Sequence, residues 1–445
     1  MLSRLAVRLS EVTQQVVPSA FAIALVLTLF TFGLAVVVAG APPSRVVIEW
    51  GNGFWMLVPF GMQMALVVLS GFLVSTAPVM DRLFARLATR ARSPRGAVVL
   101  MALVSMALAW VHWGLSLVGC AMFIRHVVRA EPRVDYRLLV CTAYFGMGAT
   151  WHAGLSASAP LLVATPGHFL ESTIGLIPVG ETIFSPFNLG LTSIVVTLLA
   201  VLAAVLHPPV HEARPIDPTL LDKLERFDPP SVVSPATFAS RIDHSRLLTV
   251  AVAGCGGGWL VWYFGTNGFA LTLDVLNFGF LMLAILLHPS AASVLAAAER
   301  GAALLSGIVL QFPFYAGMYG VIQGTGLAQI FGESIATVAT AETLPVWLYW
   351  YSGVVNYFVP SGGSKWAIEA PYLVDAAVRL GVPTPQVVLA YAWGDMATDI
   401  IQPFWALPLL AAARIDFRDI MGYAFVVFLF YNVVVSLGFW LLPKL

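Results

Sequence analysis

Two carboxylates stand in the stretch Gly394-Asp395-Met396-Ala397-Thr398-Asp399, inside an apolar run that covers residues 388–413 and is long enough to span a membrane. A charged side chain at hydrocarbon depth costs about 2.5–3.5 kcal/mol on insertion scales, so both aspartates require a functional or structural reason. The same frame occurs 248 residues earlier (394 − 146 = 248), where Trp151 and His152 replace Asp399 and Ile400. The matching positions of the earlier copy are Gly146, Ala149, Thr150, Pro160, Leu161 and Leu162.

The composition is that of a membrane protein. Of the 445 residues, 59% are hydrophobic and 10% are charged, whereas a soluble domain has about 25% charged residues. Long apolar runs recur along the whole chain, which indicates an all-α polytopic membrane protein rather than a β-barrel with short alternating segments. The formal net charge is zero, so nothing indicates a nucleic-acid partner. The three cysteines lie in apolar segments and predict neither a disulfide framework nor a metal site.

The order of apolar and basic segments predicts two inverted repeats with about nine spans plus two re-entrant hairpins. Arginines flank the apolar segment 97–124 on both sides, and a hairpin keeps both groups in the cytoplasm where a crossing would separate them. The segment 345–377 predicts the second hairpin, which enters from outside. The predicted divisions are an interfacial N-terminal helix at 1–17, a first repeat at 18–206, a cytoplasmic linker at 207–245, an inverting span at 246–264 and a second repeat at 265–445.

The two predicted hairpins are separated by 248 residues, the same separation as the two copies of the broken-helix motif. At this offset Val111, Gly114 and Ser116 match Val359, Gly362 and Ser364. The first two predicted spans align with apolar runs of the second half at the same offset. Because one extra span separates the repeats, the second is predicted to be inverted relative to the first. Inverted repeats with broken helices that meet near the midplane are typical of secondary transporters. Such breaks expose N–H groups that attract anions and C=O groups that attract cations.

Four side chains near the breaks are candidate ligands of a coupling cation or proton. They are His152, Asp395, Thr398 and Asp399. The two aspartates lie four residues apart, on one face of a continuous helix. Alternatively, they cap the broken helix or pair with Lys365. His152 could transfer protons near neutral pH, although a buried neutral histidine bonded to backbone is the commoner case, and the same holds for His112.

The hairpin tips and the first break supply the candidate substrate-binding residues. They are Gly114, Ser116, Thr150, Asn356, Ser361, Gly362, Gly363, Ser364 and Lys365. N–H and hydroxyl groups at a tip can bind a carboxylate, and glycine allows close backbone approach. The alternatives are structural: the tips only reverse the chain, Thr150 bonds to its own helix and Asn356 joins two helices. Lys365 could neutralise the substrate or pair with Asp395, Asp399 or Glu369.

Further motifs are spread over both halves. They are Trp113-Gly114-Leu115-Ser116, Gly154-Leu155-Ser156-Ala157-Ser158, Gln311-Phe312-Pro313-Phe314-Tyr315, Val359-Pro360-Ser361-Gly362-Gly363 and Gln402-Pro403-Phe404-Trp405. Over residues 12–443 the chain resembles the AtoE-type short-chain fatty acid transporter family. The resemblance implies a bacterial inner-membrane carrier for butyrate or acetoacetate. It also implies kinship with the ion-transporter superfamily, whose members combine a scaffold with a mobile transport domain and often form homodimers.

We therefore expect a secondary active transporter of short-chain fatty acids in a bacterial inner membrane, with a cytoplasmic N-terminus and H+ or Na+ as coupling ion. No cofactor is expected beyond such a Na+ ion. The partners are a small monocarboxylate, the lipid bilayer and a second copy of the chain. An uncoupled uniporter and a carrier of another small organic anion are the alternatives. An intramembrane enzyme is disfavoured because neither HExxH nor GxSxG occurs.

Overall fold

The computed structural model describes residues 20–221, 224 and 237–441. In these ranges the chain forms α-helices and short 3₁₀ turns, without a strand, which confirms the predicted all-helical fold. The interfacial helix predicted at 1–17 lies outside the described residues. The predicted linker is described in part, and it contains the short helices α13 (Pro218–Leu221) and α14 (Phe238–Asp243).

Apolar helices make this a multi-pass membrane protein. Among the described residues, six helical segments are long and apolar enough to cross a bilayer. They are α4 (Val58–Thr76), α6 (Pro94–Val111), α12 (Pro186–Leu206), α15 (Arg246–Asn267), the segment formed by α17 (Ala291–Ala302), η2 (Ala303–Leu305) and α18 (Ser306–Gly324), and α24 (Phe417–Leu441). Shorter apolar helices are α2 (Ala20–Val37), α16 (Leu273–Leu287) and α19 (Leu327–Val338).

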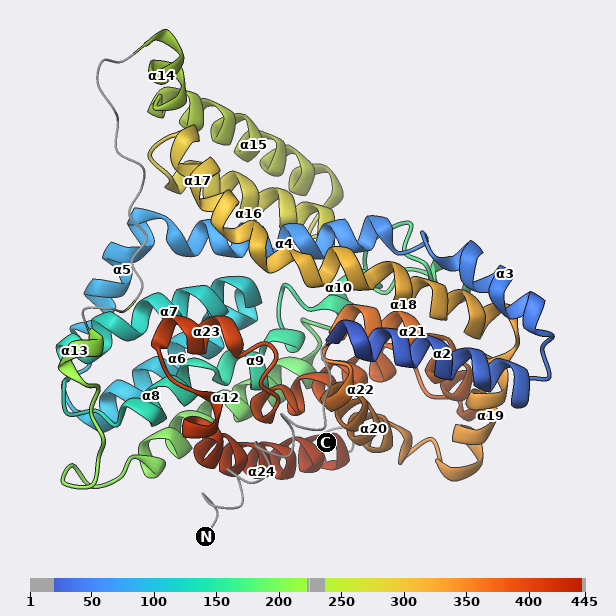
Figure 1. Cartoon of the computed structure of the whole chain (residues 1–445). Coiled ribbons are helices and arrows are strands. Elements are labelled where there is room, and N and C mark those ends of the chain that lie inside the picture. Colours follow the sequence, from blue (N-terminus) through green and yellow to red (C-terminus); the bar gives the residue numbers. More distant parts are fainter. Residues whose placement is uncertain (1–19, 222–223, 225–236, 442–445) are drawn as a thin grey trace.

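Helix boundaries repeat along the chain with the offset seen in the sequence. Helices α4 and α18 begin at Val58 and Ser306 and end at Thr76 and Gly324, which are 248 residues apart in each case (306 − 58 = 324 − 76 = 248). Helices α3 (Pro43–Gly53) and α17 begin with the same separation. In Figure 1, α4 leads from α3 to α5 (Pro78–Ala88), whereas its neighbour α18 leads from α17 to α19 at the opposite end. The two matching helices therefore run in opposite directions.

Each predicted hairpin is a pair of helices joined by a tight turn. Helices α6 and α7 (Trp113–Ala130) meet at His112, whose extended backbone ends the first helix and begins the second. Helices α20 (Leu344–Phe358) and α21 (Gly362–Leu380) are joined by three residues, 359–361. The two pairs lie in opposite halves of the molecule in Figure 1. The arms of the second pair have different neighbours, since α20 packs mainly on α22 (Thr384–Ala397) and α21 mainly on α19.

The two remaining motifs are broken helices. The first consists of α8 (Tyr136–Ala143), α9 (Phe145–Ala149), η1 (Trp151–Ala153) and α10 (Ser158–Leu162), and the second of α22, η3 (Asp399–Ile401) and α23 (Leu407–Ala413). Helix α9 in the first motif and helix α22 in the second end at the matching threonines Thr150 and Thr398. Glycine lets each broken helix approach the first arm of its hairpin. A Cβ on Gly146 would lie 2.3 Å from Ser105 O, and one on Gly394 would lie 2.1 Å from Tyr349 O.

Helix α15 covers the position of the predicted inverting span, 246–264, and continues to Asn267. Together with α14, α16 and α17 it projects from the rest of the molecule in Figure 1. The short helix α11 (Glu171–Ile174) belongs to the connection between α10 and α12. The hairpins and broken helices contain about half of the buried polar side chains among the described residues.

Candidate functional site

A cleft of about 480 Å³ lies where α4 and α18 face both hairpin tips. Its lining is mainly apolar and aromatic, and includes Met64, Val68, Trp113, Trp151, Phe312, Tyr315 and Trp405. Its polar positions include Ser158, Gln311 and Ser361. Trp405 connects the two tips, because its ring centre lies 5.4 Å from that of Trp113 and its Nε1 donates to Pro360 O at 2.9 Å. An apolar cleft with a few polar groups suits a small amphiphilic ligand.

The tip of the first hairpin is closed by the side chains of His112 and of Ser156, which belongs to the first broken helix. Leu115 N donates to His112 Nδ1 at 3.3 Å, and Trp113 N donates to Ser156 Oγ at 2.9 Å. The Ser116 hydroxyl donates to Ser105 O at 2.9 Å within the hairpin. Gly114 packs against α4, where a Cβ on Gly71 would lie 2.7 Å from the Gly114 carbonyl carbon. Gly114 and Ser116 thus take part in packing contacts, and neither is among the residues that line the cleft.

The tip of the second hairpin is open. Helix α21 begins at Gly362 without a side-chain cap, and no acceptor among the described residues pairs with the N–H groups of Gly362, Gly363 and Ser364. Ser361 Oγ donates to Ser364 Oγ at 3.0 Å. Ser361, Gly362 and Gly363 line the cleft. Free N–H groups and the positive end of the helix dipole make this terminus suited to an anion.

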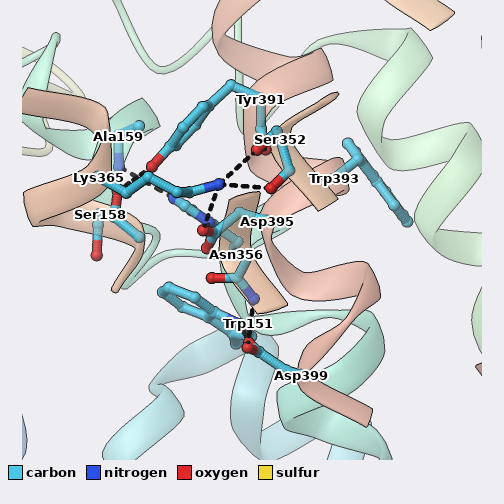
Figure 2. A network of polar contacts seen from close by, with 12 residues as sticks. Trp151, Ser158, Ala159, Ser352, Asn356, Lys365, Tyr391, Trp393, Asp395 and Asp399 are labelled. Atoms are coloured by element: carbon cyan, nitrogen blue, oxygen red, sulfur yellow. Dashed lines mark hydrogen bonds and ion pairs between the residues drawn. The ribbon is translucent and has the colours of Figure 1, made fainter. Parts of the chain in front are cut away.

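A charged cluster lies directly behind this tip (Figure 2). Lys365 Nζ is 3.0 Å from Asp395 Oδ1, and it donates to Ser352 O at 2.8 Å and to Ser352 Oγ at 2.7 Å. His152 Nδ1 is 2.8 Å from Asp395 Oδ2. Because His152 Nε2 accepts the Ala159 N–H at 3.2 Å, Nδ1 carries the ring proton and donates to Asp395. Asp395 therefore has both a cationic and a neutral partner.

Asp399 lies in a different environment, although it is only four residues away. Trp151 Nε1 donates to its Oδ2 at 3.0 Å, and Asn356 Nδ2 donates to its Oδ1 at 2.8 Å. In the described part of the chain, no Lys, Arg or His side chain forms an ion pair with Asp399. Thr398 Oγ1 donates to Gly353 O at 2.9 Å, which ties the second break to the first arm of the second hairpin. Asp399 is thus held by neutral donors alone.

Close backbone approach joins the open tip to the cluster. A Cβ on Gly362 would lie 2.7 Å from each of Asp395 Oδ2, His152 Cε1 and Trp151 Cη2. Tyr391 reinforces this contact, since its hydroxyl donates to Gly362 O at 2.6 Å and its ring lies 4.4 Å from Lys365 Nζ. The backbone of the open tip therefore packs directly against the side chains of the cluster.

The structure gathers most of the predicted residues into one region. Asn356, Ser361, Gly362, Gly363, Ser364 and Lys365 surround the second tip, next to His152, Asp395, Thr398 and Asp399. Thr150 is placed differently, because its hydroxyl donates to Met106 O at 2.9 Å and to Gly146 O at 3.3 Å, as in the structural alternative.

Residue-by-residue reading missed Trp151 as a partner of Asp399. The two are separated by 248 residues, the offset of the repeat. When the two copies are aligned, Trp151 and Asp399 occupy equivalent positions, and this correspondence is the sequence signal that indicated the contact. The aromatic groups Trp113, Tyr391 and Trp405 carried no comparable sequence signal.

Comparison with known proteins identifies the family to which the chain belongs. The sequence model of the family described as "Short chain fatty acid transporter" matches residues 1–442. The chain belongs to the short-chain fatty acid transporter family. It is 37% identical to a relative from Escherichia coli strain K12 over 439 residues, and this match covers 98% of this chain and 99% of the relative. A relative from Haemophilus influenzae is 34% identical over 449 residues, covering 99% and 100%. Both are named "Putative short-chain fatty acid transporter".

Solved structures of transporters share the fold along almost the whole chain. The YdaH transporter of Alcanivorax borkumensis has a TM-score of 0.60 at 18% identity, covering 96% of this chain and 97% of its own. MtrF of Neisseria gonorrhoeae, described with a class of antimetabolite efflux pumps, has a TM-score of 0.55 at 15% identity, covering 97% and 96%. The resemblance seen in the sequence motifs is thereby confirmed at the level of the family, and membership in a transporter family implies a transport role rather than an enzymatic one.

Proposed function

We propose that this protein is a secondary active transporter that moves short-chain monocarboxylates such as butyrate or acetoacetate across the bacterial inner membrane, coupled to H+ or Na+. The observation that carries the proposal is the uncapped N-terminus of α21, which opens on an apolar cleft and is backed by Lys365 and Asp395. A carboxylate is the ligand group that such a terminus favours, and a short alkyl tail suits the cleft.

The substrate carboxylate then accepts hydrogen bonds from the N–H groups of Gly362, Gly363 and Ser364, and the Ser361 hydroxyl can join them by turning away from Ser364 Oγ. The alkyl tail lies against the aromatic side chains of the cleft, among them Trp113, Phe312 and Trp405. Lys365 does not touch the substrate. It follows the tip by less than one helical turn and is occupied by Asp395 and Ser352. Its charge adds to the positive potential at the helix terminus.

The charges behind the tip supply the reason for coupling. Asp395 pairs with Lys365 and accepts from the neutral His152, whereas Asp399 has neutral donors alone. An anion bound at Gly362 therefore adds negative charge beside a cluster that already has more carboxylates than cations. Entry of a cation or proton into this cluster would offset that cost, so binding of the two is mutually favourable. The proposed coupling ligands are His152, Asp395, Thr398 and Asp399.

The opposite directions of α4 and α18 support an inverted repeat in which the two helix pairs are re-entrant hairpins that approach from opposite membrane faces. Movement of the hairpins and broken helices against α4 and α18 would expose the cleft to each side in turn. We further propose a cytoplasmic N-terminus and a homodimer, as in the resembling superfamily.

The test is uptake of radiolabelled butyrate into proteoliposomes with Na+ and pH gradients imposed separately and the membrane potential clamped. Protein-free vesicles under the same gradients are the control, since undissociated butyric acid crosses lipid unaided. The proposal predicts protein-dependent accumulation with one of the two gradients. Protein-dependent equilibration that neither gradient drives uphill would identify an uncoupled uniporter, and absence of protein-dependent flux would refute the substrate class.

A further inference from the structure

Glu369 is a buried carboxyl group that the account above does not use. It lies in α21, one turn after Lys365, and is 1% exposed. Neither Oε1 nor Oε2 has a hydrogen-bond partner among the described residues. The nearest cation, Lys365 Nζ, is 4.0 Å from Glu369 Oε2, beyond hydrogen-bond distance.

The surroundings of Glu369 offer no other compensation for a negative charge. Lys365 is already engaged by Asp395 Oδ1 at 3.0 Å and by two oxygens of Ser352. The further titratable groups that face Glu369 are Asp395, Tyr351, Tyr372 and Tyr391. The hydroxyls of Tyr351 and Tyr372 bond to each other at 2.8 Å, and that of Tyr391 donates to Gly362 O. No tyrosine hydroxyl is directed to Glu369.

The three buried carboxyls of this region therefore differ in what stabilises them. Asp395 has an ammonium and an imidazole N–H, and Asp399 accepts two N–H groups. Glu369 accepts no hydrogen bond from the described residues, and its one charged partner is the more distant Lys365 Nζ at 4.0 Å. A buried carboxylate without a donor or counter-ion costs several kcal/mol, whereas a buried carboxylic acid lacks only its hydrogen bonds. With one ammonium among three carboxyls, a proton on the unpartnered one reduces the net charge of the group from −2 to −1.

We propose that Glu369 is the proton-binding carboxyl of the transport cycle, so that the coupling ion is H+. This inference rests on the proposed transport function and chooses between its two coupling ions. In the state described, Glu369 is a carboxylic acid and Lys365 pairs with Asp395. Lys365 Nζ is 3.0 Å from Asp395 and 4.0 Å from Glu369, so rotation about its terminal bonds can exchange these partners. When Lys365 turns to Glu369, the O–H bond of Glu369 breaks and its proton leaves to the aqueous side then open.

The exchange of partners also explains how the substrate senses the proton. Gly362 lies against Asp395 Oδ2, and Lys365 belongs to the same helix as the tip. A carboxylate bound at Gly362 favours the state in which Glu369 is neutral, because protonation of Glu369 removes one negative charge from the region around the substrate. Release of the substrate removes this preference, and the proton can leave Glu369.

Infrared spectroscopy of the purified full-length protein tests the proton directly, without any substrate. The wild-type protein at neutral pH is expected to show the C=O stretch of a protonated carboxylic acid, and Glu369→Gln is expected to remove it. Glu333→Gln is the matched control, since Glu333 is exposed and pairs with Arg379. Persistence of the band in Glu369→Gln, or its loss in Asp399→Asn instead, would overturn the proposal. If Glu369→Gln does not fold, Glu369→Asp must shift the band, and an unshifted band counts against the assignment.

Transport supplies the second readout. In proteoliposomes, Glu369→Gln should retain butyrate exchange in the absence of a gradient but lose protein-dependent accumulation driven by a pH gradient. Accumulation at the wild-type level by Glu369→Gln would contradict the inference, as would wild-type accumulation driven by Na+ alone. If the wild-type protein exchanges no butyrate, the proposed function fails on its own, while the infrared band still decides whether Glu369 holds the proton.

Discussion

At the scale of single residues, the two hairpin tips differ most in one matching pair. His112 at the first tip corresponds to Pro360 at the second (360 − 112 = 248). His112 accepts the N–H of Leu115 and so caps α7, whereas Pro360 has no side-chain acceptor and α21 begins uncapped. Proline also ends α20 nearby, because it cannot donate into a helix. This pair contributes to the difference between the tips, together with Ser156, which accepts the Trp113 N–H at the first tip, and Ser361, whose hydroxyl donates to Ser364 Oγ at the second.

Gly362→Ala tests the contact between the open tip and the cluster. The added methyl would lie 2.7 Å from atoms of Asp395, His152 and Trp151, and hydrogen bonds hold these side chains in place. We expect a loss of about 1–3 kcal/mol in folding stability and loss of butyrate uptake from correctly inserted protein. Gly254→Ala is the control, since no atom lies within 4 Å of a Cβ there. Normal uptake by Gly362→Ala would show that this contact is dispensable.

Lys365→Met tests the ion pair. The substitution leaves Asp395 buried without its cation, which should cost about 3–5 kcal/mol of stability. Adding Asp395→Asn removes the uncompensated charge, so the double variant should be more stable than Lys365→Met alone. Thermal unfolding in detergent measures the coupling between the two sites. Additive losses would mean that Lys365 and Asp395 do not act as a pair.

Asp399→Asn tests the role of the second carboxylate. The amide offers one acceptor oxygen where Trp151 and Asn356 both donate, so one N–H group loses its partner. The expected cost is about 1–3 kcal/mol, together with loss of gradient-driven uptake measured in proteoliposomes. Wild-type accumulation by this variant would remove Asp399 from the proposed coupling site.

At the scale of elements, the sequence predicted positions better than contacts. Apolar length, Gly and Ser at the turns and a constant offset predicted the positions of two features. These are the helix breaks at Thr150 and Thr398 and the hairpins at 97–124 and 345–377. The neighbours of each arm did not follow, because helix packing depends on side chains distant in sequence. Gly71 against Gly114 and Gly146 against Ser105 are contacts that no local pattern encodes. The bonding of Thr150 likewise depends on Met106, which lies in another helix.

The orientation of the hairpins predicts opposite accessibility for the loops at their bases. Arg92 precedes α6 and Glu342 precedes α20, and both are exposed. In a background with Cys255→Ser, which removes the exposed native cysteine, Arg92→Cys should react with a membrane-impermeant maleimide only from the cytoplasmic side. Glu342→Cys should react only from the outer side. Labelling of both from the same side would exclude opposite entry of the hairpins.

At the scale of the whole molecule, the two copies of the repeated sequence pattern carry different chemical groups at matching positions. The charged residues Lys365, Glu369 and Asp395 have the apolar counterparts Leu117, Ala121 and Met147 at the same offset. These three buried charges therefore belong to the second copy alone, although α4 and α18 share their boundaries at this offset. The first copy supplies Trp113, Trp151 and His152 to the same region. The 248-residue offset was visible in the sequence, whereas the contacts between the two halves required the three-dimensional arrangement.

The account depends above all on where the substrate carboxylate binds. A structure of the protein in a lipid nanodisc with bound butyrate, determined by cryo-electron microscopy, measures this directly. The account predicts that the carboxylate oxygens lie about 2.7–3.2 Å from backbone nitrogens of Gly362, Gly363 or Ser364, with the alkyl tail against Trp113 or Trp405. Butyrate bound at the His112 tip or outside the cleft, with the terminus of α21 free, would contradict it.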